Sequence, residues 1–164
     1  VKNRTQAAGK IILFGHSAGG QFVHRWALLG GKKNVDVIAV ANSGWFTMPD
    51  RDIDYPYGIK NVGITDEELG EAFAKPVILF MGEKDVERKP PFRDTPEADA
   101  QGMNRMERCT NYFRQCKAKA EELRVPFRWK LETVEGAAHQ GVKMAEGAAA
   151  YIFGKSSEDR NRRV

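Results

Sequence analysis

The sequence predicts an α/β protein in which a mostly parallel sheet of about four strands is flanked by helices. Short continuous apolar runs recur along the chain, which is typical of strands that are buried on both faces. Segments with apolar residues at helical spacing alternate with these runs, and strands that alternate with helices form parallel sheets. The 164 residues, 41% hydrophobic and 29% charged, have the composition of an ordinary globular domain.

The first half of the chain contains three of the predicted strands. A short apolar run predicts a strand over 10–14, and apolar residues at helical spacing predict a helix over 18–29. A second buried strand is predicted over 35–41. A capping box that begins at Thr65 opens a short helix that ends near residue 73, and a third buried strand follows over 77–81.

The second half begins with a long helix. Thr95 is its predicted N-cap and Pro96 its first helical residue, and we place the helix at 96–124. The following residues alternate well enough to predict a fourth strand over 127–134. A last helix is predicted over 142–153.

One face of the long helix is apolar. The stripe consists of Met103, Met106, Thr110, Phe113, Cys116, Ala120 and Leu123. We expect Met103 and Met106 to be core residues, because a stripe at helical spacing usually packs inward. Cys109 and Cys116 lie seven residues apart, which separates their Cα atoms by about 10.5 Å on a helix. A disulfide needs less than about 7 Å, so free thiols are predicted.

Residues 1–154 show no internal repeat and no linker, so we interpret them as part of a single domain. Residues 155–164 form a polar tail that we expect to be disordered. The net charge of +4 comes partly from this tail, so the charge does not indicate nucleic-acid binding. No apolar run approaches the roughly 18 residues that span a membrane. We expect a soluble protein whose compartment the sequence leaves open, the cytoplasm being slightly favoured.

A glycine-flanked serine lies where the first strand meets the first helix. Gly15-x-Ser17-x-Gly19 in this position is a nucleophile-elbow pattern. We expect both flanking glycines to be required because a side chain at either would collide with the neighbouring strand or helix. The helix N-terminus offers the N–H of Ala18 to a developing oxyanion. A phosphate loop is excluded because it requires Lys and then Ser or Thr directly after the glycines. In this chain Gln21 occupies the position of that lysine. A glycine-rich turn with a spectator serine is the structural alternative.

Three histidines are candidates for the base that a serine nucleophile needs. His139 follows the fourth strand in a loop of small residues, from which an imidazole reaches over the strand ends. His16 precedes the serine, so its side chain should leave the turn in a different direction. His24 lies inside the first helix. The order serine, acid, histidine also favours His139.

The acid that would orient this histidine is predicted in the turn after the third strand. Asp85 is the preferred residue and Glu83 the alternative. Asp94 and Asp99 are weaker candidates, because one lies in a loop and the other in the first turn of a helix. The scattered histidines and the cysteines lack metal-ligand spacing, so we expect no metal site.

The irregular segment 43–63 is interpreted as a short cap over the same edge of the sheet. Its aromatic residues would line an apolar substrate pocket. The predicted lining residues are Trp45, Phe46, Tyr55 and Tyr57. The alternative is a loop that only seals the end of the sheet.

Three pieces of the chain resemble the α/β-hydrolase superfamily. They are Ile-Leu-Phe-Gly-His-Ser-Ala-Gly-Gly at 12–20, Pro-Val-Ile-Leu-Phe-Met-Gly-Glu-Lys-Asp at 76–85 and Glu-Gly-Ala-Ala-His at 135–139. The sequence is most similar to small bacterial esterases related to dienelactone hydrolases and polyester depolymerases. The resemblance runs from residue 10 to about 153 and implies a partial α/β-hydrolase fold, the C-terminal half of a fold that normally has eight strands. The N-terminal strands and the loop that supplies the second oxyanion donor have no counterpart here.

The resemblance implies hydrolysis of a carboxylic ester through an acyl-serine intermediate, with Ser17, Asp85 and His139 as catalytic residues and no cofactor. A peptidase, thioesterase or acyltransferase would use the same groups. A non-catalytic fragment or subunit that needs another chain is an alternative of a different class. The expected partners are a small-molecule ester and the N-terminal half of the fold, in the same polypeptide or a partner chain. Neither nucleic acid nor a membrane is expected.

Overall fold

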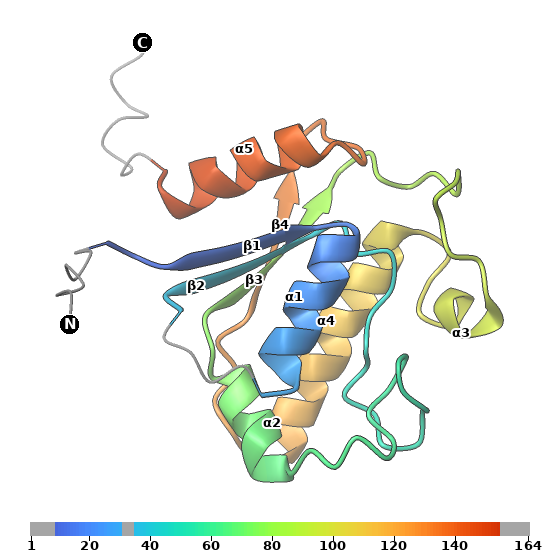
Figure 1. The fold of residues 1–164 in the computed structure, drawn as a ribbon, viewed down its shortest axis with the longest axis vertical. Coiled ribbons are helices and arrows are strands. Elements are labelled where there is room, and N and C mark those ends of the chain that lie inside the picture. Colours follow the sequence, from blue (N-terminus) through green and yellow to red (C-terminus); the bar gives the residue numbers. More distant parts are fainter. Residues whose placement is uncertain (1–8, 31–34, 155–164) are drawn as a thin grey trace, which may run out of the picture.

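The computed structural model describes residues 9–30 and 35–154 (Figure 1). Four strands form one sheet: β1 (Ile12–His16), β2 (Val37–Ala41), β3 (Val77–Gly82) and β4 (Lys130–Val134). Their order is β1-β2-β3-β4, and every neighbouring pair is parallel. The predicted fold class is therefore confirmed. The predicted polar tail, 155–164, lies outside the described residues.

The helices form a layer on each side of this sheet. The helices α1 (Ala18–Leu28), α2 (Asp66–Phe73) and α4 (Arg105–Glu122) lie together on one face, and α5 (Gly141–Ile152) crosses the other (Figure 1). The short helix α3 (Pro96–Asp99) lies in the connection between β3 and α4. None of the helices in the described ranges is long and apolar enough to cross a membrane.

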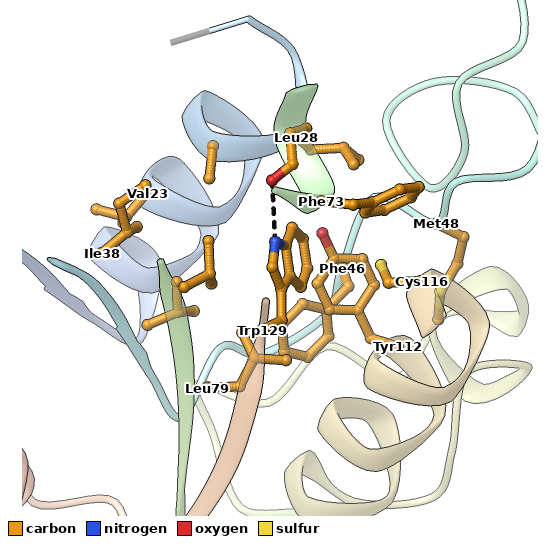
Figure 2. Packing of buried hydrophobic residues seen from close by; sticks show 14 of the residues in the cluster. Val23, Leu28, Ile38, Phe46, Met48, Phe73, Leu79, Tyr112, Cys116 and Trp129 are labelled. Carbon is orange, nitrogen blue, oxygen red and sulfur yellow. Dashed lines mark hydrogen bonds between the residues drawn. The ribbon is translucent and has the colours of Figure 1, made fainter. Parts of the chain in front are cut away.

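The main core fills the space between the sheet and the three helices on one face (Figure 2). Its centre is aromatic: Tyr112 of α4 stacks on Phe46, and Trp129 donates a hydrogen bond of 3.0 Å to the carbonyl of Ala72. A second, smaller core lies under α5, where Met144 packs against Ala39 and neighbouring side chains of the sheet. Alternate residues of β2 thus face two cores, as expected of a strand buried on both faces.

The predicted long helix is interrupted. Gly102 lies between α3 and α4 with φ at +144°, and a Cβ there would lie 2.6 Å from the Cβ of Glu107. Asn104 then caps α4 by accepting a hydrogen bond from the Glu107 N–H. Met103 falls in this break and is 53% exposed, so its prediction as a core residue is wrong. Met106 does pack against the core.

The buried face of α4 includes the two cysteines. Cys109 and Cys116 are both buried and free, which confirms the prediction of two thiols without a disulfide. Burial raises the pKa of both thiols because the thiolate would be desolvated. They therefore pack as small apolar residues in this helix face.

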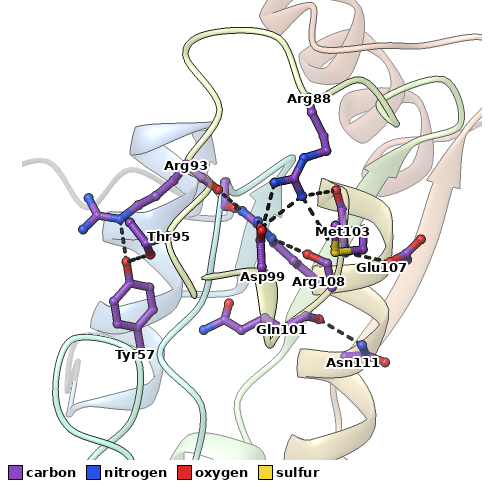
Figure 3. A network of polar contacts seen from close by, with 12 residues as sticks. Tyr57, Arg88, Arg93, Thr95, Asp99, Gln101, Met103, Glu107, Arg108 and Asn111 are labelled. Atoms are coloured by element: carbon purple, nitrogen blue, oxygen red, sulfur yellow. Dashed lines mark hydrogen bonds and ion pairs between the residues drawn. The ribbon is translucent and has the colours of Figure 1, made fainter. Parts of the chain in front are cut away.

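A buried arginine fixes the loops around α3 (Figure 3). Arg108 has no exposed side-chain surface and pairs with Asp99, which also binds Arg88. The guanidinium of Arg108 also donates to the backbone carbonyls of Gly44, Arg93 and Gly102. Because these carbonyls come from separate segments, Arg108 ties the connection before α4 to the residues that follow β2.

The strand ends are aligned, and this alignment places the candidate site. His16 pairs with Ala41 across β1 and β2, and Gly82 pairs with Val134 across β3 and β4. The residues that follow the four strands therefore leave the sheet at the same edge. In parallel sheets this carboxyl edge is where ligand chemistry gathers.

Candidate active site

Ser17 forms a sharp turn between β1 and α1. Its φ of 55° and ψ of −116° are unusual for a residue with a side chain. The Ser17 N–H donates a hydrogen bond of 2.9 Å to the carbonyl of Ala41 at the end of β2. Helix α1 starts at Ala18, so the Ala18 N–H belongs to the first turn, whose amides lack intrahelical acceptors.

The glycines around this turn have different roles. A Cβ on Gly15 would lie 2.3 Å from the carbonyl oxygen of Gly19, and a Cβ on Gly20 would lie 2.6 Å from Ser43 Oγ. A Cβ on Gly19 would meet no atom of the described residues within 4 Å. The expectation that Gly19 is required to avoid a collision is therefore wrong, because its open side faces outward from the first turn of α1. The close packing occurs at Gly15 and Gly20.

Three of the predicted site residues meet at the carboxyl edge. Nε2 of His139 is 2.9 Å from Ser17 Oγ, and Nδ1 of His139 is 2.7 Å from Asp85 Oδ2. With its proton on Nδ1, the imidazole donates to Asp85 and accepts from the Ser17 hydroxyl. Asp85 is almost fully buried, whereas a quarter of the His139 side chain is exposed. The nucleophile, base and acid candidates, far apart in sequence, form one hydrogen-bonded chain.

Arg105 is a fourth member of this group that the sequence did not indicate. Its Nη1 lies 3.1 Å from Asp85 Oδ1, the carboxylate oxygen that His139 does not use. The side chains of Arg105 and Asp85 are only 5% and 3% exposed. Nη2 of Arg105 donates to the Pro91 carbonyl at 3.0 Å. An arginine in the first turn of a helix is normally solvated, so only the fold reveals that it neutralises a buried carboxylate.

The alternative acids have other partners. Glu83 accepts a hydrogen bond of 2.7 Å from the N–H of Gly136, so its carboxylate holds the loop that leads to His139. Asp99 pairs with the two arginines of the loop network. Asp94 is exposed. Of the four acids considered, Asp85 is the one in hydrogen-bond contact with His139.

The remaining histidines differ from each other. His24 is fully buried in α1, where its Nδ1 donates to the Gly20 carbonyl and its Nε2 accepts from the Thr47 N–H. Burial lowers the pKa of His24 to about 3, so the ring stays neutral. The His16 ring lies beside His139, with centroids 4.8 Å apart. Burial, followed by the charge of His139, lowers the pKa of His16.

The aromatic residues of the segment 43–63 are mostly buried. Phe46 is in the main core between His24 and Tyr112, so its predicted place in a substrate pocket is corrected. The Phe46 ring packs between α1 and α4, where it is completely shielded from solvent. Trp45 and Tyr57 pack on each other and are 7% and 8% exposed, whereas Tyr55 is 52% exposed.

A cavity of about 450 Å³ opens beside the base and acid candidates. Asp85 and His139 form part of its wall, together with Lys84, Pro91 and Arg105. Within the described ranges, no cluster of histidine, cysteine and carboxylate side chains could hold a metal ion. The arrangement joins a serine hydroxyl, an imidazole and a carboxylate by hydrogen bonds, and the imidazole and the carboxylate border an open space.

The chain matches no protein-family model and no curated protein sequence. Among solved structures it is similar to poly(aspartic acid) hydrolase-1 from Sphingomonas sp. KT-1, with 35% identity and a TM-score of 0.82 over 85% of this chain and 53% of that one. It is also similar to LpqC, a poly(3-hydroxybutyrate) depolymerase from Bordetella parapertussis, with 31% identity and a TM-score of 0.80 over 93% of this chain and 53% of that one. The chain therefore spans about half the length of both proteins.

Proposed function

We propose that the chain, which belongs to the α/β-hydrolase superfamily, carries the catalytic residues of a serine hydrolase that cleaves carboxylic esters. The observation that supports the proposal most strongly is the pair of hydrogen bonds from Ser17 through His139 to Asp85. This geometry matches a nucleophile whose base is oriented by a third group. The strained backbone of Ser17 supports the same role.

In the proposed reaction, Ser17 Oγ attacks the ester carbonyl carbon while its proton passes to Nε2 of His139. Asp85 accepts the Nδ1 hydrogen bond and stabilises the imidazolium. The tetrahedral intermediate then collapses, the bond to the alcohol oxygen breaks, and the alcohol takes the proton from Nε2. Water, deprotonated by His139, next attacks the acyl-serine and releases the acid and the free Ser17 hydroxyl.

The oxyanion of the tetrahedral intermediate needs hydrogen-bond donors. The Ala18 N–H lies at the start of α1 next to Ser17, where the helix dipole also favours negative charge. We propose it as one donor. The second donor would come from outside the four strands that the described residues form, as the resemblance implies.

One similar protein is described as a poly(3-hydroxybutyrate) depolymerase, and that polymer is a polyester. This similarity supports an ester as the substrate. The other similar protein is described as a poly(aspartic acid) hydrolase, and poly(aspartic acid) is joined by amide bonds. Amide hydrolysis is therefore the second candidate. Thioester hydrolysis and acyl transfer would use the same groups and differ in the leaving group or the acceptor.

The edge strand β1 supports a further part of the proposal. Among the described residues β1 has a neighbouring strand on one side only, and Ile11, Phe14 and Phe22 nearby are 58%, 36% and 64% exposed. An open apolar strand edge is a template for pairing. We propose that the N-terminal half of the fold, in the same polypeptide or a partner chain, pairs with β1 and supplies the second oxyanion donor.

Two measurements test these proposals. A fluorophosphonate probe, followed by mass spectrometry of the labelled peptide, should modify Ser17, and Ser17→Ala should abolish labelling. Ser43→Ala is the matched control, because Ser43 is buried nearby and its Oγ has no hydrogen-bond partner among the described residues. Labelling that persists in Ser17→Ala would overturn the assignment.

The second measurement concerns the β1 edge. Residues 1–164 alone should associate on size exclusion and should hydrolyse p-nitrophenyl esters poorly, since loss of one oxyanion donor costs about 10²–10³ in rate. A monodisperse monomer with ordinary enzyme rates would refute the need for a further segment. Comparing p-nitrophenyl esters with the matching anilides then separates ester from amide hydrolysis.

A further inference from the structure

The structure assigns a positioning role to Asn42: we propose that its side chain holds the loop of His139 against the turn of Asp85. This inference rests on the proposed function, because it concerns the geometry of the same base and acid. It adds the residue that directly follows β2, a strand whose end contributes none of the three catalytic candidates.

Asn42 stands at the centre of the carboxyl edge. It follows β2, which lies between β1 and β3 in the sheet. Its backbone N–H donates to the Phe80 carbonyl at 3.1 Å, and the preceding carbonyl, of Ala41, accepts the Ser17 N–H. The Asn42 side chain is buried and its φ is +44°, a conformation that asparagine tolerates better than most residues.

Both ends of the Asn42 amide are occupied. Oδ1 accepts a hydrogen bond of 2.7 Å from the N–H of Gly82, the last residue of β3. Nδ2 donates a hydrogen bond of 2.9 Å to the carbonyl of Ala138, the residue before His139. One side chain thus connects the start of the acid's turn to the peptide that carries the base. These two partners also fix the orientation of the amide.

The loop before His139 also forms hydrogen bonds with the turn that carries Asp85. These bonds are made by loop residues that lie further from His139 in the sequence than Ala138 does. The Lys84 N–H donates to Ala137 at 2.7 Å, and Glu83 accepts from Gly136. The loop lies so close to the strand end that a Cβ on Gly82 would be 2.8 Å from the carbonyl oxygens of Ala137 and Ala138. The Asn42 bond to Ala138 is therefore the contact adjacent to His139.

Loss of this bond would leave the partly buried Ala138 carbonyl without its protein partner, and such a group tends to shift until it finds another donor. Movement of the Ala138 carbonyl turns the peptide that bears His139. A misplacement of about 1 Å in a catalytic group can cost about 10²-fold in rate. Deleting the Asn42 amide should therefore slow turnover without changing substrate binding.

Two variants separate the bonds. Asn42→Gly removes both hydrogen bonds and adopts the positive φ without strain. Asn42→Asp keeps an acceptor for Gly82 but loses the donor to Ala138. Asn61→Gly is the matched control, because Asn61 also has a positive φ, of 61°, and is exposed in the segment 43–63.

The test uses the active form of the protein, this chain together with the segment that completes its sheet. Asn42→Gly and Asn42→Asp should lower kcat by about 10²-fold with KM changed by less than about twofold. Asn61→Gly should match the parent. Proton NMR should show the downfield signal of the His139 Nδ1 proton in the parent and its loss or upfield shift in Asn42→Gly, while circular dichroism remains that of the folded protein.

Either of two results would overturn the inference. One is an Asn42→Gly variant with the parent's kcat. The other is a loss of turnover that only follows the unfolded fraction, with the Nδ1 proton signal unchanged. A parent that does not react with the fluorophosphonate probe would instead overturn the proposed function and this inference with it.

Discussion

Removing Arg105 should destabilise the protein more than its position on the first turn of a helix suggests. Arg105 and Asp85 are 5% and 3% exposed and are joined at 3.1 Å. Unit charges about 4 Å apart attract by about 4 kcal/mol at an effective dielectric constant of about 20. Arg105→Met keeps much of the buried apolar stem but leaves the Asp85 carboxylate without its cation. Breaking a buried pair in this way typically costs about 3–5 kcal/mol.

Arg88 provides the matched control. It pairs with Asp99 at 2.9 Å, but the two side chains are 34% and 28% exposed. Solvent screens such a pair, so Arg88→Met should destabilise the protein much less than Arg105→Met does. Both variants are compared with the parent by urea unfolding at neutral pH, in the active form of the protein.

A double-mutant cycle then isolates the pair. Asp85→Asn combined with Arg105→Met should cost less than the sum of the two single changes, because neither charge is left alone. An Arg105→Met variant that loses less than about 1 kcal/mol would refute the reasoning. It would mean that water reaches the Asp85 carboxylate when the arginine is absent, so that the burial of the carboxylate depends on the arginine itself.

Three other predictions concern the acid, the elbow and the buried histidine. Asp85→Asn should cut the turnover of the protein that remains folded by about 10⁴, whereas Glu83→Gln, which keeps an acceptor for the loop, should have little effect; reversed results in steady-state assays would make Glu83 the acid. Gly15→Ala should cost about 1–3 kcal/mol or more in urea unfolding because its Cβ has no room, whereas Gly19→Ala should cost under about 1 kcal/mol; equal losses would contradict the packing described. Because burial lowers the pKa of His24 from 6.5 to about 3, below pH 6.5 the unfolded chain takes up a proton that the folded protein excludes. Stability relative to His24→Gln should therefore fall by about 1.4 kcal/mol per pH unit as the pH drops from about 6 to 4, and a constant difference would show that the ring is solvated.

The elements and the elbow were predictable because they depend on neighbours in the sequence. The strands are continuous apolar runs, and the turn at Ser17 needs the glycines a few residues away. The meeting of Asp85 and His139 was also predictable, since both follow strands of a parallel sheet and such strands end at one edge. The catalytic role of these residues stays a prediction.

Other features depended on partners that no local pattern reveals. The break before α4 follows from the conformation of Gly102, in a stretch whose apolar spacing alone continues as a helix. Phe46 is buried because its ring packs between His24 of α1 and Tyr112 of α4.

The contacts around the candidate site show the same limit. Arg105 meets a carboxylate twenty positions away, and Asn42 meets a carbonyl ninety-six positions away. In the sequence each is a polar residue beside a helix start or a strand end, where solvent would satisfy it equally well. Only the packing of three strand ends and a helix N-terminus excludes that solvent, and burial then makes each hydrogen bond specific to one partner.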